Sequence, residues 1–427
     1  MSTRNNSARL ALGVAGGLAL AGCSSQVAAR QPERPPHHEE PATASLAAHR
    51  ALAQRLDRVL DGAIAEQRIV GAVVLVARGG TLVYHRPVGL LDREARLPMT
   101  ERAVFRLASL TKPIVALAVL ALVEQGKLSL DDAISRWLPQ LQFRDASGRP
   151  ERISIRQLLT HTSGLGYGFL EPPDGPYHRA QVSDGLDQPG LSFEENARRL
   201  TSVPLGFPPG TGFRYSLGYD VLGEVAACAA RQPLASLVRE LVTGPLGMHD
   251  TAFEVADVER LAVPYADAGP AARRMRDPEH VPFEASEIRF APSRVLHPAS
   301  YASGGAGMVG TAGDFLALLE LLRINDGKLV GRDAVQSMLS NQVDTLAAPF
   351  LGEGQGFGFG VAVVLDRERA GLPLSSGAFH WGGVYGHNFW VDPHAQLSVV
   401  VLTNTAVEGM SGALVTGVRE AVYDAFR

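Results

Sequence analysis

The stretch that decides the fold is FRLASLTKPIVALAVLALVEQGK, residues 105–127. Residues 114–123 are all apolar, and a helix that is apolar on every side is expected to be buried in a core. Ser109 and Lys112 stand three residues apart where this helix, predicted over residues 109–125, begins. Residues at that spacing share one face of a helix. The stretch therefore predicts a core helix with a serine and a lysine side by side at its mouth.

This pairing suits a serine nucleophile. The partial positive charge of a helix N-terminus favours an oxyanion, and a desolvated lysine has a lowered pKa that allows proton transfer. The alternative is structural, with a capping serine and a lysine whose stem covers apolar surface, and the motif alone gives both equal weight. Lys112 is one of three lysines among 40 basic residues. Arginine could not give up its proton, so chemistry would require lysine here.

The composition of the chain excludes several classes of protein. The 427 residues are 46% hydrophobic and 20% charged, which excludes a disordered or collagen-like chain. The net charge of −4 gives no general attraction to nucleic acid. Two cysteines provide neither a disulfide framework nor a cysteine-based zinc site, and the 12 histidines show no spacing typical of a metal cage. We therefore expect no metal and no cofactor.

The first 45 residues are expected to lie outside the fold. Residues 1–22 have a basic start and a short apolar run, as in a secretory signal, and end in Leu-Ala-Gly before Cys23, which looks like a bacterial lipobox. The alternative is a buried cysteine in an apolar helix. Residues 23–45 are rich in Pro, Arg, Glu and Ala and predict a flexible tether. A lipid on Cys23 would anchor the protein to a membrane of the bacterial cell envelope, on the periplasmic side of the outer membrane in a Gram-negative source.

The remaining chain, residues 46–427, shows strand patterns at both ends and helices between them. The simplest arrangement is α+β: one antiparallel sheet formed by N- and C-terminal strands, flanked by helices, with a mostly helical insertion over about residues 128–345. A doubly wound parallel sheet is disfavoured because strands and helices do not alternate regularly. Terminal helices are predicted at 46–67 and 411–425, and strands at 70–77, 81–86, 357–365, 379–381, 387–391 and 397–403.

Several motifs, in this order, resemble one family. The segment at 105–113 is similar to the active-site segment of the serine β-lactamase and penicillin-binding-protein-like group, and most similar to class C β-lactamase-related esterases, the family VIII-type carboxylesterases. The resemblance covers about residues 50–425 and implies the β-lactamase/transpeptidase-like fold. The other matching segments are EQGKLSLDD (124–132), LLTHTSGL (158–165), PGTGFRYS (209–216), PLGM (245–248) and WGGVYG (381–386).

The resemblance implies a role for each matching residue. Ser109 resembles the nucleophile that forms an acyl-enzyme, and Lys112 its proton-transfer partner. Tyr215 resembles the tyrosine of a Tyr-x-Asn motif. As a phenolate supported by the positive charge of Lys112, it would take the Ser109 proton. The oxyanion hole would be the backbone N–H groups of Ser109 and Val384.

Two departures from the family pattern bear on the substrate. Leu217 stands where β-lactamases have an amide, and Trp381-Gly382-Gly383 stands where they have Lys-Thr-Gly. An amide and a cation are thus both replaced by apolar groups, so these four residues are expected in the substrate pocket. Glycines there would let a substrate approach the strand. A neutral, fairly apolar ester and broad specificity are expected.

Other residues have weaker assignments. His161 has a structural interpretation at the edge of the site, although a catalytic one stays open, and His380 and His387 bracket the Trp381 turn. Cys228, flanked by alanines, is expected to be a small core residue. The stretch at 164–191, rich in Gly, Pro, Tyr and Asp, is expected to contribute three aromatic residues to the pocket wall: Tyr167, Phe169 and Tyr177.

The sequence thus favours a metal-independent serine carboxylesterase that acts on a small-molecule ester. A second hypothesis is a β-lactamase or D-amino-acid peptidase, against which Leu217 and Trp381 argue. A third is a non-catalytic binding module of the cell envelope. That module would be expected to lack the serine, lysine or tyrosine, and all three are present.

Overall fold

An eight-stranded antiparallel sheet joins the two ends of the chain in the computed structural model, which describes residues 42–267, 271–344, 346 and 349–426. Its strand order is β10-β11-β12-β13-β14-β1-β2-β3. The predicted signal, most of the tether and Cys23 lie outside the described residues. The bounds are β1 Gly71–Arg78, β2 Thr81–Asp92, β3 Leu97–Pro98, β10 Gln355–Phe357, β11 Ala362–Val364, β12 Phe379–Gly383, β13 His387–Asp392 and β14 Leu397–Thr403.

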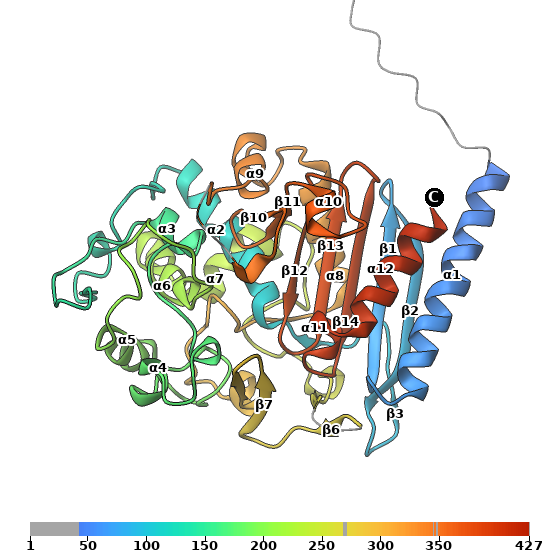
Figure 1. Ribbon diagram of the computed structural model, residues 1–427, viewed down its shortest axis with the longest axis horizontal. Helices are drawn as coiled ribbons and strands as arrows, with labels where there is room; N and C mark the ends of the chain where they lie inside the picture. The colour runs from blue at the N-terminus through green and yellow to red at the C-terminus, as the bar shows by residue number, and fades with distance from the viewer. Residues whose placement is uncertain (1–41, 268–270, 345, 347–348, 427) are drawn as a thin grey trace, which may run out of the picture. The chain divides into compact units, whose positions relative to one another are not determined.

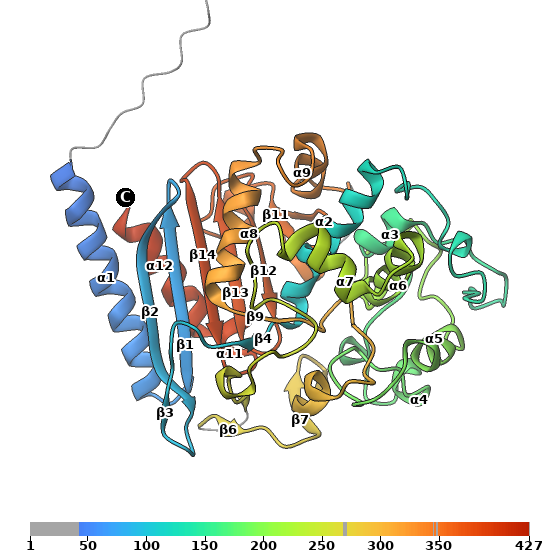
Figure 2. The ribbon, with the colours of Figure 1, turned by 180° about the vertical axis from the view of Figure 1, so that it is seen from behind.

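The central pair of strands explains why the ends meet. β1 and β14 run antiparallel with Val74 opposite Val401, and both are strings of buried aliphatic residues. Because side chains alternate along a strand, one face of this pair packs on one helical layer and the other face on a second layer. The first layer is α1 (Ala42–Ala65) and α12 (Ala413–Ala425), and α8 (Ala312–Ile324) covers the opposite face (Figures 1 and 2).

The core helix is α2 (Thr111–Glu124), preceded by a 3-10 turn, η1 (Ala108–Leu110). Its residues from Thr111 to Leu122 are all buried, as its apolar sequence predicts. Around it pack α6 (Gly218–Ala230), α7 (Leu234–Val238) and α9 (Arg332–Met338), while α3 (Ile155–Leu159) packs on α6. Among the described residues, no helix combines the length and the apolar content needed to cross a bilayer.

Two details differ from the sequence expectation. The strand predicted at 357–365 is a hairpin of β10 and β11, because Gly360 turns with φ +85° and brings its backbone close to Lys112. The expected insertion at 128–345 includes α8, which packs on the sheet, and short strands. These strands are β5 (Tyr265–Ala266), β6 (Arg273–Arg274), β7 (Glu279–Phe283), β8 (Ser286–Phe290) and β9 (Val309–Gly310), of which β9 pairs with β4 (Phe105–Arg106).

The other short elements connect these parts. The α-helical turns are α4 (Pro176–Arg179), α5 (Phe193–Thr201), α10 (Arg367–Ala370) and α11 (Glu408–Ser411). Among the shorter helical turns, η7 (Pro349–Leu351) lies next to β10 and contributes to the site described below.

Candidate active site

Ser109 lies in η1, at the entrance to α2 and beside β12. Its side chain is almost covered, with 8% of the residue exposed. Ala108, directly before it, has φ +46°, a left-handed conformation that costs energy for a residue with a side chain. A strained turn therefore presents the serine at the helix mouth.

The structure brings the three residues of the predicted mechanism together. The Tyr215 hydroxyl donates a hydrogen bond to Ser109 Oγ at 2.7 Å, although 106 residues separate the two in sequence. Lys112 Nζ lies 3.1 Å from the same oxygen. Both groups that could move a proton to or from Ser109 are thus within hydrogen-bond reach of it.

Lys112 is fully buried, and its amine is held by few groups. Besides Ser109, Nζ donates a hydrogen bond to the backbone oxygen of Gly305 at 2.9 Å. The rings of Tyr215, Tyr167 and Tyr219 surround the amine at 4.7, 5.2 and 5.9 Å from their centroids. Burial lowers the pKa of Lys112 to about 7. A large fraction of the amine is therefore neutral near neutral pH and can accept the Ser109 proton.

The phenolate expected at Tyr215 does not fit its surroundings. Burial raises the pKa of Tyr215 well above its ordinary value, and the hydrogen bonds with Ser109 and Trp381 only partly oppose this. The expectation relied on a full positive charge at Lys112, and burial disfavours that charge too. Burial thus favours the neutral forms of both groups: an amine at Lys112 that can accept a proton, and a Tyr215 hydroxyl that donates to Ser109.

Trp381 lies in β12 against Tyr215. Its indole Nε1 donates a hydrogen bond to the Tyr215 hydroxyl at 3.2 Å, and the two rings are 5.2 Å apart. The tryptophan that replaces a family cation is thus part of the hydrogen-bond chain from Trp381 through Tyr215 to Ser109, as well as an apolar surface.

The glycines after Trp381 have a different role from the one expected. A Cβ on Gly383 would lie 2.6 Å from the backbone oxygen of Leu107, and a Cβ on Gly382 would lie 2.6 Å from the Met410 side chain. The space beside both residues is filled by the protein itself, so these glycines let β12 approach η1 and α11 rather than leave room for substrate. Any contact of Gly382 and Gly383 with substrate would therefore involve only their backbone atoms.

Val384 follows directly in the turn after β12. Its carbonyl oxygen accepts a hydrogen bond from the Val407 N–H at 3.3 Å, and Val407 itself has φ +68°, which is rare for a β-branched residue. The turn is therefore held in a defined orientation beside η1. The oxyanion role of the Val384 and Ser109 N–H groups stays a prediction.

Leu217 and the three aromatic residues expected in the wall are all buried. Leu217 precedes α6, and its N–H donates to the Gly166 oxygen at 3.2 Å. Tyr167 lies 5.2 Å from the Tyr215 ring and stacks on Phe169 at 4.7 Å. Tyr177 accepts a hydrogen bond from the Gly166 N–H and supports this loop from behind. Tyr167 therefore borders the site, where it also contacts Lys112.

The three histidines near the site are held in their uncharged form. His161 is buried, with its ring 4.6 Å from that of Tyr215, and burial together with nearby Lys112 lowers its pKa well below the ordinary value. Burial also lowers the pKa of His380 to about 3 and that of His387 to about 4. All three are neutral at physiological pH, which favours the structural interpretation of His161. The described residues contain no cluster of three metal-binding side chains.

Three residues near the site were missed by the sequence analysis. Phe350, in η7, stacks face to face on the Tyr215 ring at 5.3 Å and 8°, while 44% of the residue stays exposed. Asp220 and Gly305 lie on the other side of Lys112: the Gly305 carbonyl oxygen accepts a hydrogen bond from the Lys112 amine, and the Gly305 N–H donates to Asp220. For Asp220 a signal existed, since an acid interrupts an otherwise apolar helix start. Phe350 has no comparable signal in its local sequence.

One expectation outside the site is wrong. Cys228 is exposed on α6, where its Sγ lies 3.8 Å from Glu224 Oε1, because its place in the helical repeat turns it to the surface despite the alanines around it.

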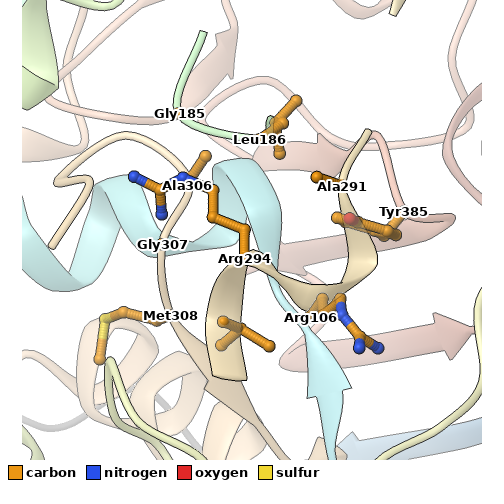
Figure 3. A pocket seen from close by; sticks show the side chains of 10 residues that line it. Arg106, Gly185, Leu186, Ala291, Arg294, Ala306, Gly307, Met308 and Tyr385 are labelled. Carbon is orange, nitrogen blue, oxygen red and sulfur yellow. The ribbon is translucent and has the colours of Figure 1, made fainter. Parts of the chain in front are cut away.

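A small cavity lies next to the segments that carry the site (Figure 3). It is lined by residues next to the catalytic segments, among them Arg106, Ala306 and Tyr385, with Arg294 extending along it. Its volume of about 20 Å³ has room for about one water molecule. Ser109 is not among its lining residues, so this cavity does not mark the place where substrate meets the nucleophile.

A nearly buried serine held by a lysine and a tyrosine, on an α+β fold of this topology, defines a serine hydrolase that works through an acyl-enzyme. The chain belongs to the Beta-lactamase family, whose pattern matches residues 56–422. The resemblance and the fold inferred from the sequence are thereby confirmed, as is the prediction of a serine hydrolase.

Known relatives add detail. The chain is 50% identical over 376 residues to "Esterase EstB" of Burkholderia gladioli, covering 87% of this chain and 95% of that protein. It is 31% identical to "Lovastatin esterase" of Penicillium rubens, over 69% and 74% of the two chains. The solved structure of "EstCE1, a hydrolase with promiscuous acyltransferase activity" is similar with a TM-score of 0.84 and 43% identity, covering 88% of this chain and 99% of that one.

Proposed function

We propose that the protein is a serine carboxylesterase that forms its acyl-enzyme on Ser109 and prefers neutral, fairly apolar esters. The observation that carries this proposal is the contact of Ser109 with both Lys112 and Tyr215 beneath Trp381, the residue that stands in place of a cation. The esterase names of the relatives support the same reaction.

The geometry suggests the following cycle. Neutral Lys112 takes the hydroxyl proton of Ser109 as Oγ bonds to the ester carbonyl carbon. The oxyanion of the tetrahedral intermediate is stabilised at the mouth of α2. The C–O bond to the alcohol then breaks, and the alcohol leaves with a proton passed from Lys112 through Tyr215. Water then attacks the acyl-enzyme as Lys112 takes its proton, the bond between the acyl carbon and Ser109 Oγ breaks, and the proton returns to Oγ as the acid is released.

The surroundings of Ser109 favour uncharged substrates. Tyr215, Trp381, Tyr167 and Phe350 present rings near the nucleophile, and burying an isolated substrate carboxylate among them would be costly. Lactams and wall peptides that rely on an amide and a cation for recognition find Leu217 and Trp381 instead. Ester hydrolysis is therefore proposed ahead of β-lactamase or peptidase activity.

Acyl transfer to an added alcohol is a second candidate activity. The acyl group on Ser109 would lie among apolar rings that favour a small alcohol over water near the ester carbon. The structurally similar EstCE1 is itself named a hydrolase with promiscuous acyltransferase activity. Ester formation from an added alcohol, measured beside hydrolysis, tests it.

The test of the main proposal is a substrate panel with purified protein. We expect hydrolysis of short p-nitrophenyl and alkyl esters, much weaker hydrolysis of nitrocefin and D-peptides, and loss of all turnover in Ser109→Ala. Ser147→Ala, in an exposed turn, is the matched control and retains activity. Nitrocefin turnover exceeding ester turnover would reverse the choice, and ester hydrolysis by Ser109→Ala would refute the nucleophile. Failure of a fluorophosphonate to label Ser109 would favour the non-catalytic binding module.

We also propose that Cys23 carries a lipid and that the enzyme is held on a membrane of the bacterial cell envelope. The support is the lipobox-like sequence before Cys23 and the tether-like composition that follows it.

A further inference from the structure

Asp220 is a buried acid in the first turn of α6 that the cycle above does not use. It is 3% exposed, and its carboxylate accepts three hydrogen bonds, all from the segment 301–305. Oδ1 accepts from Ser303 Oγ at 2.7 Å and from the Gly305 N–H at 2.8 Å, and Oδ2 accepts from the Tyr301 hydroxyl at 2.7 Å. The segment 301–305 is thus held to α6 through this one carboxylate.

Gly305 connects this carboxylate to the active site. Its N–H points to Asp220, and its carbonyl oxygen accepts the hydrogen bond from Lys112 Nζ at 2.9 Å. A Cβ at this position would lie 2.9 Å from the Tyr167 hydroxyl and 3.1 Å from Asp220 Oδ1. Gly305 is therefore tightly packed, and its backbone links the Asp220 carboxylate to the Lys112 amine.

The charged and titratable groups that face Lys112 come from several elements. Asp220 on α6 and Asp184 on the 183–187 segment favour its protonated form, whereas burial opposes it. Burial raises the pKa of Asp184 to about 7, so this acid is only partly ionised near neutrality. His161 is neutral, and the tyrosines around the amine are uncharged because burial raises the pKa of each: Tyr167, Tyr215 and Tyr219. Asp220 is then the main negative charge that acts on Lys112.

We propose that Asp220 is the positioning residue for Lys112: it fixes the Gly305 carbonyl that holds the amine, and its negative charge sets the pH at which the amine becomes neutral. The proposal rests on the proposed role of Lys112 as the base of the esterase. It predicts an unusual outcome, in which removing an acid makes the enzyme more active at low pH.

The decisive variant is Asp220→Asn, which keeps the size of the side chain and an oxygen for the Ser303 and Gly305 contacts but removes the charge. We expect the acid limb of kcat/KM to move to lower pH by about one unit, so that activity well below the wild-type midpoint rises by up to about tenfold. Asp220→Ala removes the Gly305 anchor as well and is expected to lower activity at every pH. Asp314→Asn is the matched control, because Asp314 is a partly buried acid that binds Thr251 elsewhere, and its profile should not move.

The readouts separate this inference from the esterase proposal. Ester hydrolysis against pH is measured beside the rate of covalent labelling of Ser109 by a fluorophosphonate, which needs the same base but no ester substrate. If the wild type labels without hydrolysing esters, the esterase proposal fails and labelling still tests Asp220. An Asp220→Asn midpoint that stays in place or moves to higher pH, in protein with an unchanged melting temperature, overturns the inference. If that variant does not fold, the same comparison is made with Tyr301→Phe, which removes a neutral donor whose dipole partly offsets the negative charge of the carboxylate. Its midpoint should move to higher pH, and a midpoint that stays in place or moves to lower pH overturns the inference.

Discussion

At the scale of single residues, burial acts in opposite ways on the two groups that contact the serine. Lys112 and Tyr215 both contact Ser109 Oγ, and removal from water disfavours the charged form of each. For lysine the disfavoured form is the proton donor, whereas for tyrosine it is the proton acceptor. The same low-dielectric site thus makes the base form of Lys112 more available and the base form of Tyr215 less available, which fits the complementary roles proposed for them.

The pH dependence follows directly. With neutral Lys112 as the proposed base and its pKa lowered to about 7, kcat/KM should rise with pH through about 7 and level off above it. Below the midpoint the loss should be about tenfold per pH unit. Lys112→Arg should remove activity across the whole range, because guanidinium keeps its proton. A rate profile of a short ester measures this, and a flat profile between pH 5 and 9 would contradict it.

Phe350 gives a prediction about substrate choice. Its ring is exposed and parallel to that of Tyr215, so an aromatic part of an ester can pack against it at the rim. Phe350→Ala should lower kcat/KM for phenyl acetate and ethyl benzoate by about threefold to tenfold, the range for a lost aromatic contact, and should change ethyl acetate by less than about twofold.

The comparison of phenyl acetate with ethyl benzoate shows which side of the ester meets Phe350. Leu296→Ala, at another exposed apolar residue away from Tyr215, is the control and should leave all three esters unchanged. An equal fall for aromatic and alkyl esters would mean that Phe350 supports Tyr215 rather than selects substrate.

These residues show how far sequence reasoning reaches. Ser109, Lys112, Tyr215 and Trp381 were found because each lies in a short motif with its own pattern. Phe350 and Gly305 act only through contacts across the fold, such as the 193 residues between Lys112 and Gly305, and no local pattern encodes that distance. The raised pKa of Tyr215, which disfavours the expected phenolate, could not be predicted for the same reason, since burial is a property of the packed molecule.

At the scale of elements, the approach of β12 to η1 shapes the site. Gly383 is needed because its missing side chain would meet a backbone oxygen, whereas the neighbour of Gly382 is the flexible Met410 side chain. Strand and helix positions were predictable from apolar patterns. The hairpin of β10 and β11 was not, because its Gly360 turn is required by contact with Lys112 and with Tyr219 on other elements.

The two glycines form a matched pair of tests. Gly383→Ala should push β12 away from the serine turn, cost about 1–3 kcal/mol of stability and lower fluorophosphonate labelling of Ser109. Gly382→Ala adds the same methyl group against a side chain that can move, so its effects on the melting temperature and on labelling should be clearly smaller. Equal effects would show that the Leu107 contact does not control the site.

At the scale of the whole molecule, the sheet explains why the site needs both ends of the chain. β12 carries Trp381 and belongs to the C-terminal strands, and β1, in the centre, is N-terminal. Ser109 lies in the chain segment between these strands. Its Oγ accepts a hydrogen bond from Tyr215, which belongs to the mostly helical part of the chain. The order of apolar strands at both ends with helices between them favoured this closure, because one antiparallel sheet is the simplest arrangement that pairs the strands of both ends.

The last prediction concerns the whole chain in a cell. A diacylglycerol on Cys23 supplies two acyl chains, enough for stable membrane attachment, whereas one chain alone binds only marginally. In a bacterial host the full chain should fractionate with membranes and show the lipid mass at its mature N-terminus. Cys23→Ser should move it to the soluble fraction. Because Ser109, Lys112, Tyr215 and Trp381 all come from residues 105–384, kcat/KM of the detergent-solubilised wild type and of Cys23→Ser should agree. Membrane association that survives the substitution would contradict the lipid anchor and leave the esterase assignment intact.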